Sequence, residues 1–125
     1  MITTVTANTA IDVAAILESL DVGGVNRSRE ARLHAGGKGV NVAKAARALG
    51  ADVLATGFVG RGPIGASLRA SLDGAGVGHD FVELAGDTRV TFVLYDLAGG
   101  SETIVNNPAG YDVTAADVAR LGDTV

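Results

Sequence analysis

A lysine set among glycines is the part of the sequence best suited to bind an anion. The segment HAGGKGVNVAKAARALG spans residues 34–50, and an amphipathic pattern follows its glycines directly. A helix N-terminus presents free backbone N–H groups and a positive dipole end, and glycine lets a ligand approach the main chain. Lys38 adds a mobile positive charge, and Asn41 can donate and accept hydrogen bonds. This pattern predicts a binding site for a small anionic molecule that carries hydroxyl groups.

The glycine-rich segments also fit structural or nucleotide-binding roles. The glycines around Lys38 could serve only the close packing of a helix on a sheet, although a Lys and an Asn at these offsets favour a ligand site. The segment is not a P-loop, because Arg32 and Gly39 occupy the positions of that motif's first Gly and its Ser/Thr. GRGPIG at residues 60–65 matches the dinucleotide pattern G-x-G-x-x-G. Because Pro63 stiffens that turn and the match lies on a second βα unit, we expect no dinucleotide there.

Positive charge concentrates around the first of these segments. The net charge of the 125-residue chain is −4, which argues against general nucleic-acid binding. Residues 1–50 carry six Lys/Arg and four acids, whereas residues 51–125 carry four Lys/Arg and ten acids. All six early cations lie between residues 27 and 47. A local positive field suits a small anion, and a solvated basic helix face accounts for the same charges equally well.

The composition excludes several protein classes. The chain has no cysteine, which rules out a disulfide scaffold and cysteine-based metal sites. The first residues, MITTVTANTAIDVAAIL, contain neither a positive n-region nor a long apolar run. We therefore expect no signal peptide, no membrane span and a cytoplasmic location. The length fits one domain with a single core, and no residues suggest a metal site.

Two strand–helix units are predicted to position the glycine-rich segments. Residues 2–7 are rich in β-branched side chains and residues 52–60 are largely apolar, so each predicts a buried strand. Residues 40–49 carry apolar side chains at i, i+3, i+4 and i+7, which predicts a helix with Gly50 as its C-terminal cap. Residues 63–75 predict a second helix, with a proline in its first turn.

The remaining segments are predicted to form a smaller antiparallel sheet and a last helix. Residues 10–20 fit a strand or a helix, and residues 25–35 alternate as an exposed strand would. Residues 89–97 and 102–107 flank a glycine pair and predict a hairpin. Thr114 is placed to cap a final helix. The element order combines βαβ units with an antiparallel sheet and predicts the α/β class.

Six segments, in order, resemble the amino-terminal half of the ribokinase-like (PfkB-type) carbohydrate kinases. They are TANTAID near the start, GGVNR at 23–27, AGGKGVNVAKAARALG at 35–50, GFVGRGPIG at 57–65, TRVTFVLYD at 88–96 and ETIVNNPAG at 102–110. The resemblance implies part of a three-layer αβα fold with a small antiparallel β lid, formed by residues 10–33 and 88–107. It also implies the transfer of a phosphoryl group from ATP, with Mg²⁺, to a ketohexose phosphate such as fructose 1-phosphate or tagatose 6-phosphate.

The resemblance assigns roles to single residues. Asp12 falls on the family's sugar-hydroxyl-binding aspartate, and Asn8 lies beside it. Arg89 falls on an arginine that contacts the phosphate of the substrate, and Arg27 lies in the flap segment, where a basic residue plays a similar part. These types suit the chemistry, because carboxylates accept sugar O–H groups and arginine pairs bidentately with phosphate. The glycine-rich signature supplies the other substrate contacts, at Gly36, Gly37, Lys38 and Asn41.

Each of these residues could instead have an ordinary structural role. Asp12 could cap a helix, Arg27 and Arg89 could be strand-edge charges, and Asn41 could be a turn residue. Departures from the family pattern occur at Thr9 and Ala35, where prolines are common, and at Asn107, where a glutamate is common. We expect these departures to loosen the flap or to change the sugar preference.

The catalytic half of such a kinase is not recognisable in the sequence. Family members are well over twice as long, and their second half carries the nucleotide pocket, the magnesium-organising acids and a GAGD signature with the catalytic base. GAGV at 74–77 and LAGD at 84–87 do not match that signature. We therefore expect a truncated kinase domain that holds no catalytic residue and is inactive alone, with ATP and Mg²⁺ bound elsewhere.

Two alternatives stay open beside the sugar-phosphate kinase. The chain could be a non-catalytic module that binds a phosphosugar or forms a homodimer through its lid strands. It could also come from a ribokinase- or adenosine kinase-type enzyme for a free sugar or a nucleoside. The arginines at positions 27 and 89 favour a substrate that is already phosphorylated.

Overall fold

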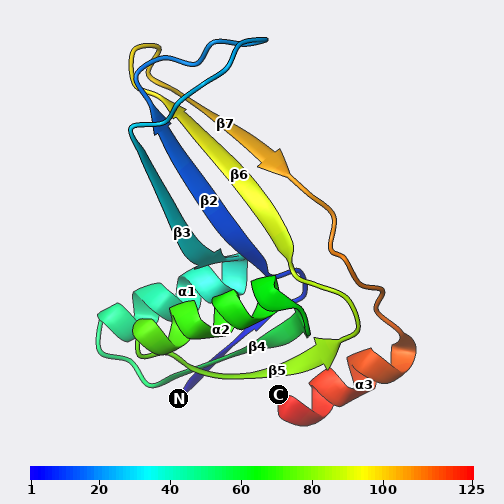
Figure 1. The fold of residues 1–125 in the computed structure, drawn as a ribbon. Coiled ribbons are helices and arrows are strands. Elements are labelled where there is room, and N and C mark those ends of the chain that lie inside the picture. The colour runs from blue at the N-terminus through cyan, green and yellow to red at the C-terminus, as the bar shows by residue number, and fades with distance from the viewer.

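The computed structural model describes residues 1–125 as two sheets, the second of which projects away from the helix-covered first (Figure 1). In chain order the elements are β1 (Ile2–Thr6), β2 (Ala10–Leu17), β3 (Glu30–Gly36), α1 (Lys38–Ala48), β4 (Val53–Gly60), α2 (Pro63–Gly74), β5 (Gly78–Leu84), β6 (Arg89–Asp96), β7 (Ser101–Asn106) and α3 (Ala115–Thr124). No helix among them is long and apolar enough to cross a membrane.

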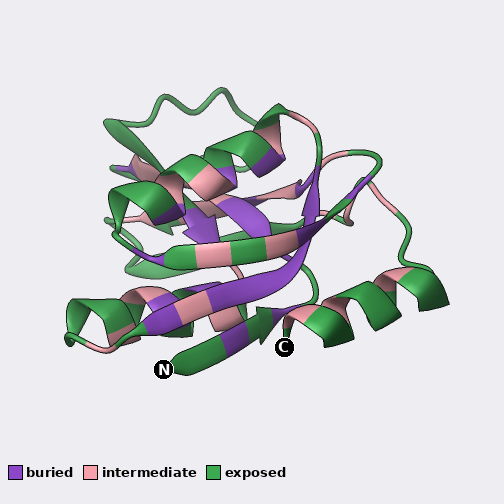
Figure 2. Cartoon of the chain, turned by 90° about the horizontal axis from the view of Figure 1, so that it is seen from below, coloured by how far each residue is buried: buried purple, intermediate pink, exposed green.

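Helices lie on both faces of the three-stranded sheet, α1 and α2 on one face and α3 on the β4–β5 part of the other. Its strands run parallel in the order β1-β4-β5, and a parallel sheet needs apolar cover on both faces. Val59 of β4 is fully buried in a cluster with α1 and α2, whereas its neighbour Phe58 joins a second cluster beside Leu121 of α3. Figure 2 shows the long buried stretch of β4 between these layers. The predicted three-layer αβα arrangement is confirmed.

The four-stranded sheet β3-β2-β6-β7 is called the lid below. Its outer pairs, β3 with β2 and β6 with β7, are antiparallel, but the central strands β2 and β6 are parallel. The lid is therefore a mixed sheet, whereas the sequence predicted an antiparallel one. The reason is that β2 and β6 both leave the core sheet in the same direction and take neighbouring places.

The third strand differs in extent from the prediction. β3 begins only at Glu30 and runs to Gly36, so the start of the strand predicted over 25–35 is five residues too early. The first part of the lid, predicted to end at residue 33, extends to Gly36. The Asn26 side chain accepts a hydrogen bond from Asp21 N–H and donates to Asp21 O, each at 2.8 Å. These bonds close a turn that keeps the chain from joining the sheet sooner.

Helix ends follow the predicted signals. α1 begins at Lys38, two residues before the helix predicted over 40–49. The apolar pattern does not reveal this earlier start, because Lys38 is exposed and does not face the core. Gly50 and Gly76 adopt the positive φ angles of 89° and 69° just after α1 and α2. Thr114 caps α3: its hydroxyl accepts from Asp117 N–H at 3.2 Å, and the Asp117 carboxylate accepts from Thr114 N–H at 2.9 Å.

One face of the lid gathers the polar residues. The ambiguous segment 10–20 forms β2, and the predicted hairpin is confirmed as β6 and β7. Asp12 pairs with Thr91, which in turn pairs with Asn106, so the three side chains share one face. Arg89 lies two residues before Thr91 and shares this face with it.

Candidate functional site

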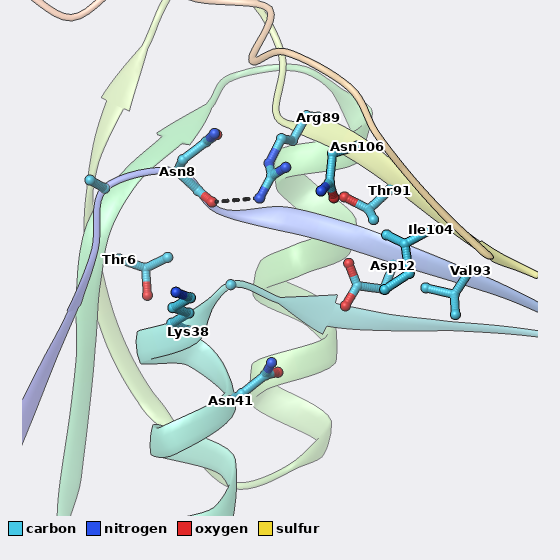
Figure 3. Close-up of a pocket in the computed structure, with 12 residues that line it drawn as sticks. Thr6, Asn8, Asp12, Lys38, Asn41, Arg89, Thr91, Val93, Ile104 and Asn106 are labelled. Atoms are coloured by element: carbon cyan, nitrogen blue, oxygen red, sulfur yellow. Dashed lines mark hydrogen bonds between the residues drawn. The ribbon is translucent and has the colours of Figure 1, made fainter. Parts of the chain in front are cut away.

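A pocket of about 580 Å³ lies where the lid meets the first turns of α1 (Figure 3). Five parts of the chain contribute to it: the end of β1 with the connection that follows it, β2, the start of α1, β6 and β7. The twelve lining residues are Thr6, Ala7, Asn8, Asp12, Gly37, Lys38, Asn41, Arg89, Thr91, Val93, Ile104 and Asn106.

The N-terminus of α1 opens onto this pocket. Gly37, the residue before the helix, has a φ of 111° that side-chain-bearing residues rarely adopt, and no side chain caps the helix. The first helical hydrogen bond runs from Asn41 N–H to Gly37 O at 2.8 Å. A Cβ on Gly39 would stand 2.7 Å from Val5 O, so glycine lets α1 approach β1. The pocket therefore has a helix dipole end that the protein's own side chains leave free.

Asp12 faces the same pocket from β2. Figure 3 shows its carboxylate pointing into the space toward which the Asn41 amide points from α1. A Cβ on Gly36 would overlap that carboxylate, so the absence of a side chain at Gly36 leaves space for the Asp12 carboxylate. Gly36 itself does not line the pocket. His34 Nε2 lies 3.7 Å from Asp12 Oδ2. Because Asp12 lies within a strand, the alternative that it caps a helix is excluded.

Lys44 adds a positive charge behind Asp12. Its ammonium donates a 2.6 Å hydrogen bond to Ala35 O, at the end of β3. Burial lowers the pKa of Lys44 below its ordinary value, and the Asp12 carboxylate acts against that shift. Lys44 thus ties the end of β3 to α1 while a neighbouring negative charge stabilises it.

Arg89 reaches from β6 to the connection between β1 and β2. Its Nη2 donates to Asn8 O at 3.3 Å, as Figure 3 shows, while its buried Nε has no hydrogen-bond partner. A guanidinium that is only partly bonded retains donors for an acidic group. Asn8 therefore contacts Arg89 through its main-chain carbonyl.

Threonines in the pocket were not predicted from the sequence. Thr6 and Thr91 are 6% and 5% exposed, and neither Oγ1 has a hydrogen-bond partner. Together with Arg89 Nε, they account for three of the four buried side-chain polar atoms that lack a partner. Buried polar groups are nearly always paired with protein, ligand or ordered water, so these atoms are available to a polar ligand in the pocket. The alternation along β6 and the hairpin register could have identified Thr91 and Asn106.

Six of the eight residues singled out from the sequence line the pocket: Asn8, Asp12, Gly37, Lys38, Asn41 and Arg89. Gly36 packs directly behind Asp12. Arg27 lies apart, exposed in the loop between β2 and β3, and the structure does not bring it to the other residues.

The second glycine-rich segment is closed by the protein itself. The Asp87 carboxylate accepts hydrogen bonds from Ile64 N–H at 3.1 Å and from Gly65 N–H at 3.0 Å, both in the first turn of α2. A Cβ on Gly62 would overlap this carboxylate. The amides that a dinucleotide phosphate would use are therefore occupied.

Comparison with known proteins decides the family. The model of the pfkB family carbohydrate kinases matches residues 3–119, nearly the whole chain. The chain belongs to the PfkB family of carbohydrate kinases. Members of this family use ATP, and the resemblance found in the six sequence segments is confirmed.

Similar proteins are phosphofructokinases. The chain is 45% identical to the 1-phosphofructokinase of Haloferax volcanii over 125 residues, and the match covers 99% of the chain and 40% of that protein. The 1-phosphofructokinase of Vibrio cholerae is 40% identical, with 99% of the chain and 38% of that protein covered. The chain thus spans about two fifths of the length of these relatives.

Solved structures of similar proteins share this fold over the matched part of their chains. A possible 1-phosphofructokinase from Thermotoga maritima matches with a TM-score of 0.91 and 34% identity, over 99% of this chain and 40% of that one. Phosphofructokinase-2 from Escherichia coli in complex with fructose-6-phosphate matches with a TM-score of 0.88 and 27% identity, over 98% of this chain and 40% of that one.

Proposed function

We propose that this chain is the substrate-binding part of a kinase that phosphorylates a ketohexose phosphate. The observation that carries the proposal is the pocket between the lid and α1, where unpartnered donors and a carboxylate face one another. The names of the similar proteins, 1-phosphofructokinase and a phosphofructokinase-2 bound to fructose-6-phosphate, support the substrate class.

The pocket offers different partners to the two parts of a sugar phosphate. Asp12 accepts hydrogen bonds from sugar hydroxyls, and Asn41 can donate or accept beside it. Arg89 and Lys38 supply positive charge for the existing phosphate, together with the free N-terminus of α1. Thr6 and Thr91 add hydroxyls that suit either part. A free sugar would leave the cationic groups unpaired, so the pocket favours a phosphorylated substrate over the ribokinase-type alternative.

The nucleotide and its magnesium are proposed to bind outside these residues. No three Asp, Glu or His side chains lie together in a way that could hold a metal ion. Phosphoryl transfer depends mostly on positioning and electrostatic stabilisation of the reacting groups. We therefore expect no ATP-dependent phosphorylation of fructose 1-phosphate or tagatose 6-phosphate by the 125-residue chain alone. Measurable turnover by this chain would contradict that expectation.

Calorimetric titration tests the proposed substrate class. The ligands are fructose 1-phosphate, fructose 6-phosphate, tagatose 6-phosphate, fructose and ribose. Hydrogen bonds to charged groups contribute about 1.5–3 kcal/mol, so Arg89→Ala should weaken binding of the phosphorylated sugars by roughly 10- to 150-fold. Binding of the free sugars should not change in this variant. Asp12→Ala should weaken binding of both kinds of sugar.

The matched control is Arg61→Ala, which removes the same charge from a side chain that is 62% exposed and outside the pocket. It should leave every affinity unchanged. Tighter binding of ribose than of any sugar phosphate would overturn the proposed substrate class.

A second proposal concerns self-association through the lid. On the face opposite the pocket, Leu33, Phe92 and Val105 lie in one row across the strands and are 67%, 42% and 45% exposed. A tetrameric form of phosphofructokinase-2 from Escherichia coli is among the similar structures, which supports association of this chain with a second copy. Sedimentation of the chain should show a dimer that Phe92→Glu dissociates, and a monomeric parent chain would contradict this second proposal.

A further inference from the structure

Asp87 is the most extensively bonded residue in the connection from β5 to β6. Its carboxylate accepts three backbone N–H bonds, from Ile64 at 3.1 Å, from Gly65 at 3.0 Å and from Thr88 at 2.8 Å. Its own carbonyl accepts from Gly110 N–H at 3.0 Å. One residue thus joins the start of α2, the start of β6 and the segment that follows β7.

The surrounding main chain closes tightly around this residue. Thr88 is 4% exposed, and its hydroxyl accepts a 3.0 Å hydrogen bond from Gly60 N–H at the end of β4. Gly62 N–H donates to Gly86 O at 3.2 Å. A Cβ on Gly60 would overlap the main chain of Asp87. The connection is therefore held from several directions and has little freedom to move.

Arg89 begins β6 only two residues after Asp87. Its guanidinium makes a single long bond to Asn8 O, so that bond alone does not fix its direction. The place where β6 leaves the core is fixed instead by the bonds of Asp87 and Thr88. We propose that Asp87 is a positioning residue that holds Arg89 in place for the phosphate of the substrate, a role that rests on the proposed function.

The same carboxylate gives Asp87 a second effect on the site. It occupies the N-terminus of α2, whose dipole would otherwise attract an anion near the connection. Only the N-terminus of α1 then remains open to the ligand, on the side where Arg89 and Lys38 lie. Asp87 thus directs the phosphate to one of two similar helix ends.

The test compares Asp87→Asn with a matched control at the other end of β6. Asp96 Oδ1 accepts a 2.9 Å hydrogen bond from Gly99 N–H in the lid hairpin, so Asp96→Asn changes a similar carboxylate–amide contact far from the core. Asp87→Asn should weaken binding of fructose 1-phosphate by about 2- to 150-fold, the range typical of coupled neighbouring residues, and leave binding of fructose unchanged. Asp96→Asn should change neither affinity.

A double-mutant cycle separates positioning from a general loss of structure. In an Arg89→Ala background, Asp87→Asn should cause no further loss of affinity for fructose 1-phosphate, because the group that Asp87 positions is already absent. Equal losses for fructose and fructose 1-phosphate, or losses that add in the double variant, would overturn the proposal.

A spectroscopic readout distinguishes this proposal from the proposed function. If the parent chain binds no sugar phosphate, the proposed function fails, but the NMR resonance of Arg89 Nε–Hε still reports the position of the guanidinium. That resonance should shift in Asp87→Asn and not in Asp96→Asn. An unshifted resonance in a folded Asp87→Asn variant would overturn the positioning role.

Discussion

The N-termini of α1 and α2 have similar glycine-rich sequences but differ in whether their backbone amides are already hydrogen-bonded by a side chain. Each helix follows a glycine, Gly37 or Gly62, and neither of these glycines provides a side-chain cap. At α2, the carboxylate of Asp87 bonds the first-turn amides, whereas no side chain caps α1, whose start lines the pocket. The comparison shows that a glycine-rich helix start stays open only where no distant acidic residue reaches it.

In the third helix, α3, the N-terminal amides are capped by residues next to them in the sequence. Thr114 and Asp117 exchange hydrogen bonds across the first turn of α3, so its N-terminus is closed by residues within the same four-residue segment. The protein therefore closes two helix starts and leaves open the one that faces the lid.

The largest expected effect is a loss of stability on removal of the Asp87 carboxylate, which removal of the Asp12 carboxylate should not cause. Asp87→Ala leaves backbone N–H groups at the start of α2 and of β6 without partners, and each such group costs about 1–3 kcal/mol. Since three amides lose their partner, the free energy of unfolding in urea should fall by at least about 3 kcal/mol. Asp12→Ala removes no amide partner and should change stability by less than about 1 kcal/mol, while weakening sugar binding.

The opposite pattern would break the comparison. If Asp12→Ala were the strongly destabilising variant and Asp87→Ala the neutral one, Asp12 would be the structural carboxylate and the pocket would lose its main hydroxyl acceptor.

A smaller effect is expected where α1 approaches β1. Gly39→Ala would place a Cβ 2.7 Å from Val5 O, and overpacking of this kind costs about 1–3 kcal/mol. Because the backbone must shift, the start of α1 should move and binding of fructose 1-phosphate should weaken as well. Gly74→Ala, at the end of α2, meets no atom within 4 Å and serves as the control in urea unfolding and calorimetry. Equal stability and affinity in both variants would show that α1 does not need its close approach.

Local patterns predicted most of the fold and the open helix start. Apolar spacing identified both helices of the βα units, and the glycine pair identified the β6–β7 hairpin. Residues 10–20 were ambiguous because a short apolar run fits either structure, and the neighbours β3 and β6 decide for a strand. The parallel pairing of β2 with β6 joins segments far apart in the sequence and leaves no local signal.

The candidate site was predictable where its residues belong to one segment or one motif. Lys38 and Asn41 were found in this way, whereas the family resemblance pointed to Asp12, and all three line one pocket. Asp87 was missed because its bond to Gly65 N–H spans 22 residues. Arg27 was selected by resemblance alone, and the structure leaves it in an exposed loop.

The smallest expected effect concerns the locally closed helix α3. Thr114→Ala removes the N-cap and should lower stability by about 1 kcal/mol. The hydrogen bond from Thr114 N–H lowers the pKa of Asp117 below its ordinary value of 3.8. Ionised Asp117 therefore stabilises the fold above pH 3.8, and this stabilisation is lost as the pH falls through the lowered pKa.

Acid unfolding of the Asp117→Ala variant checks this prediction. Compared with the parent chain, the variant should be less stable near neutral pH, and the difference should vanish at the acid end of the transition. A difference that stays constant with pH would show that the Asp117 carboxylate does not contribute through its charge.

NMR titration of the chain with fructose 1-phosphate tests the central claim most directly, because it observes both helix starts at once. The account predicts that the amide resonances of residues 38–40 shift as the ligand saturates, while those of Ile64 and Gly65 stay in place. Shifts at Ile64 and Gly65, or no shift at residues 38–40 under saturation, would contradict it.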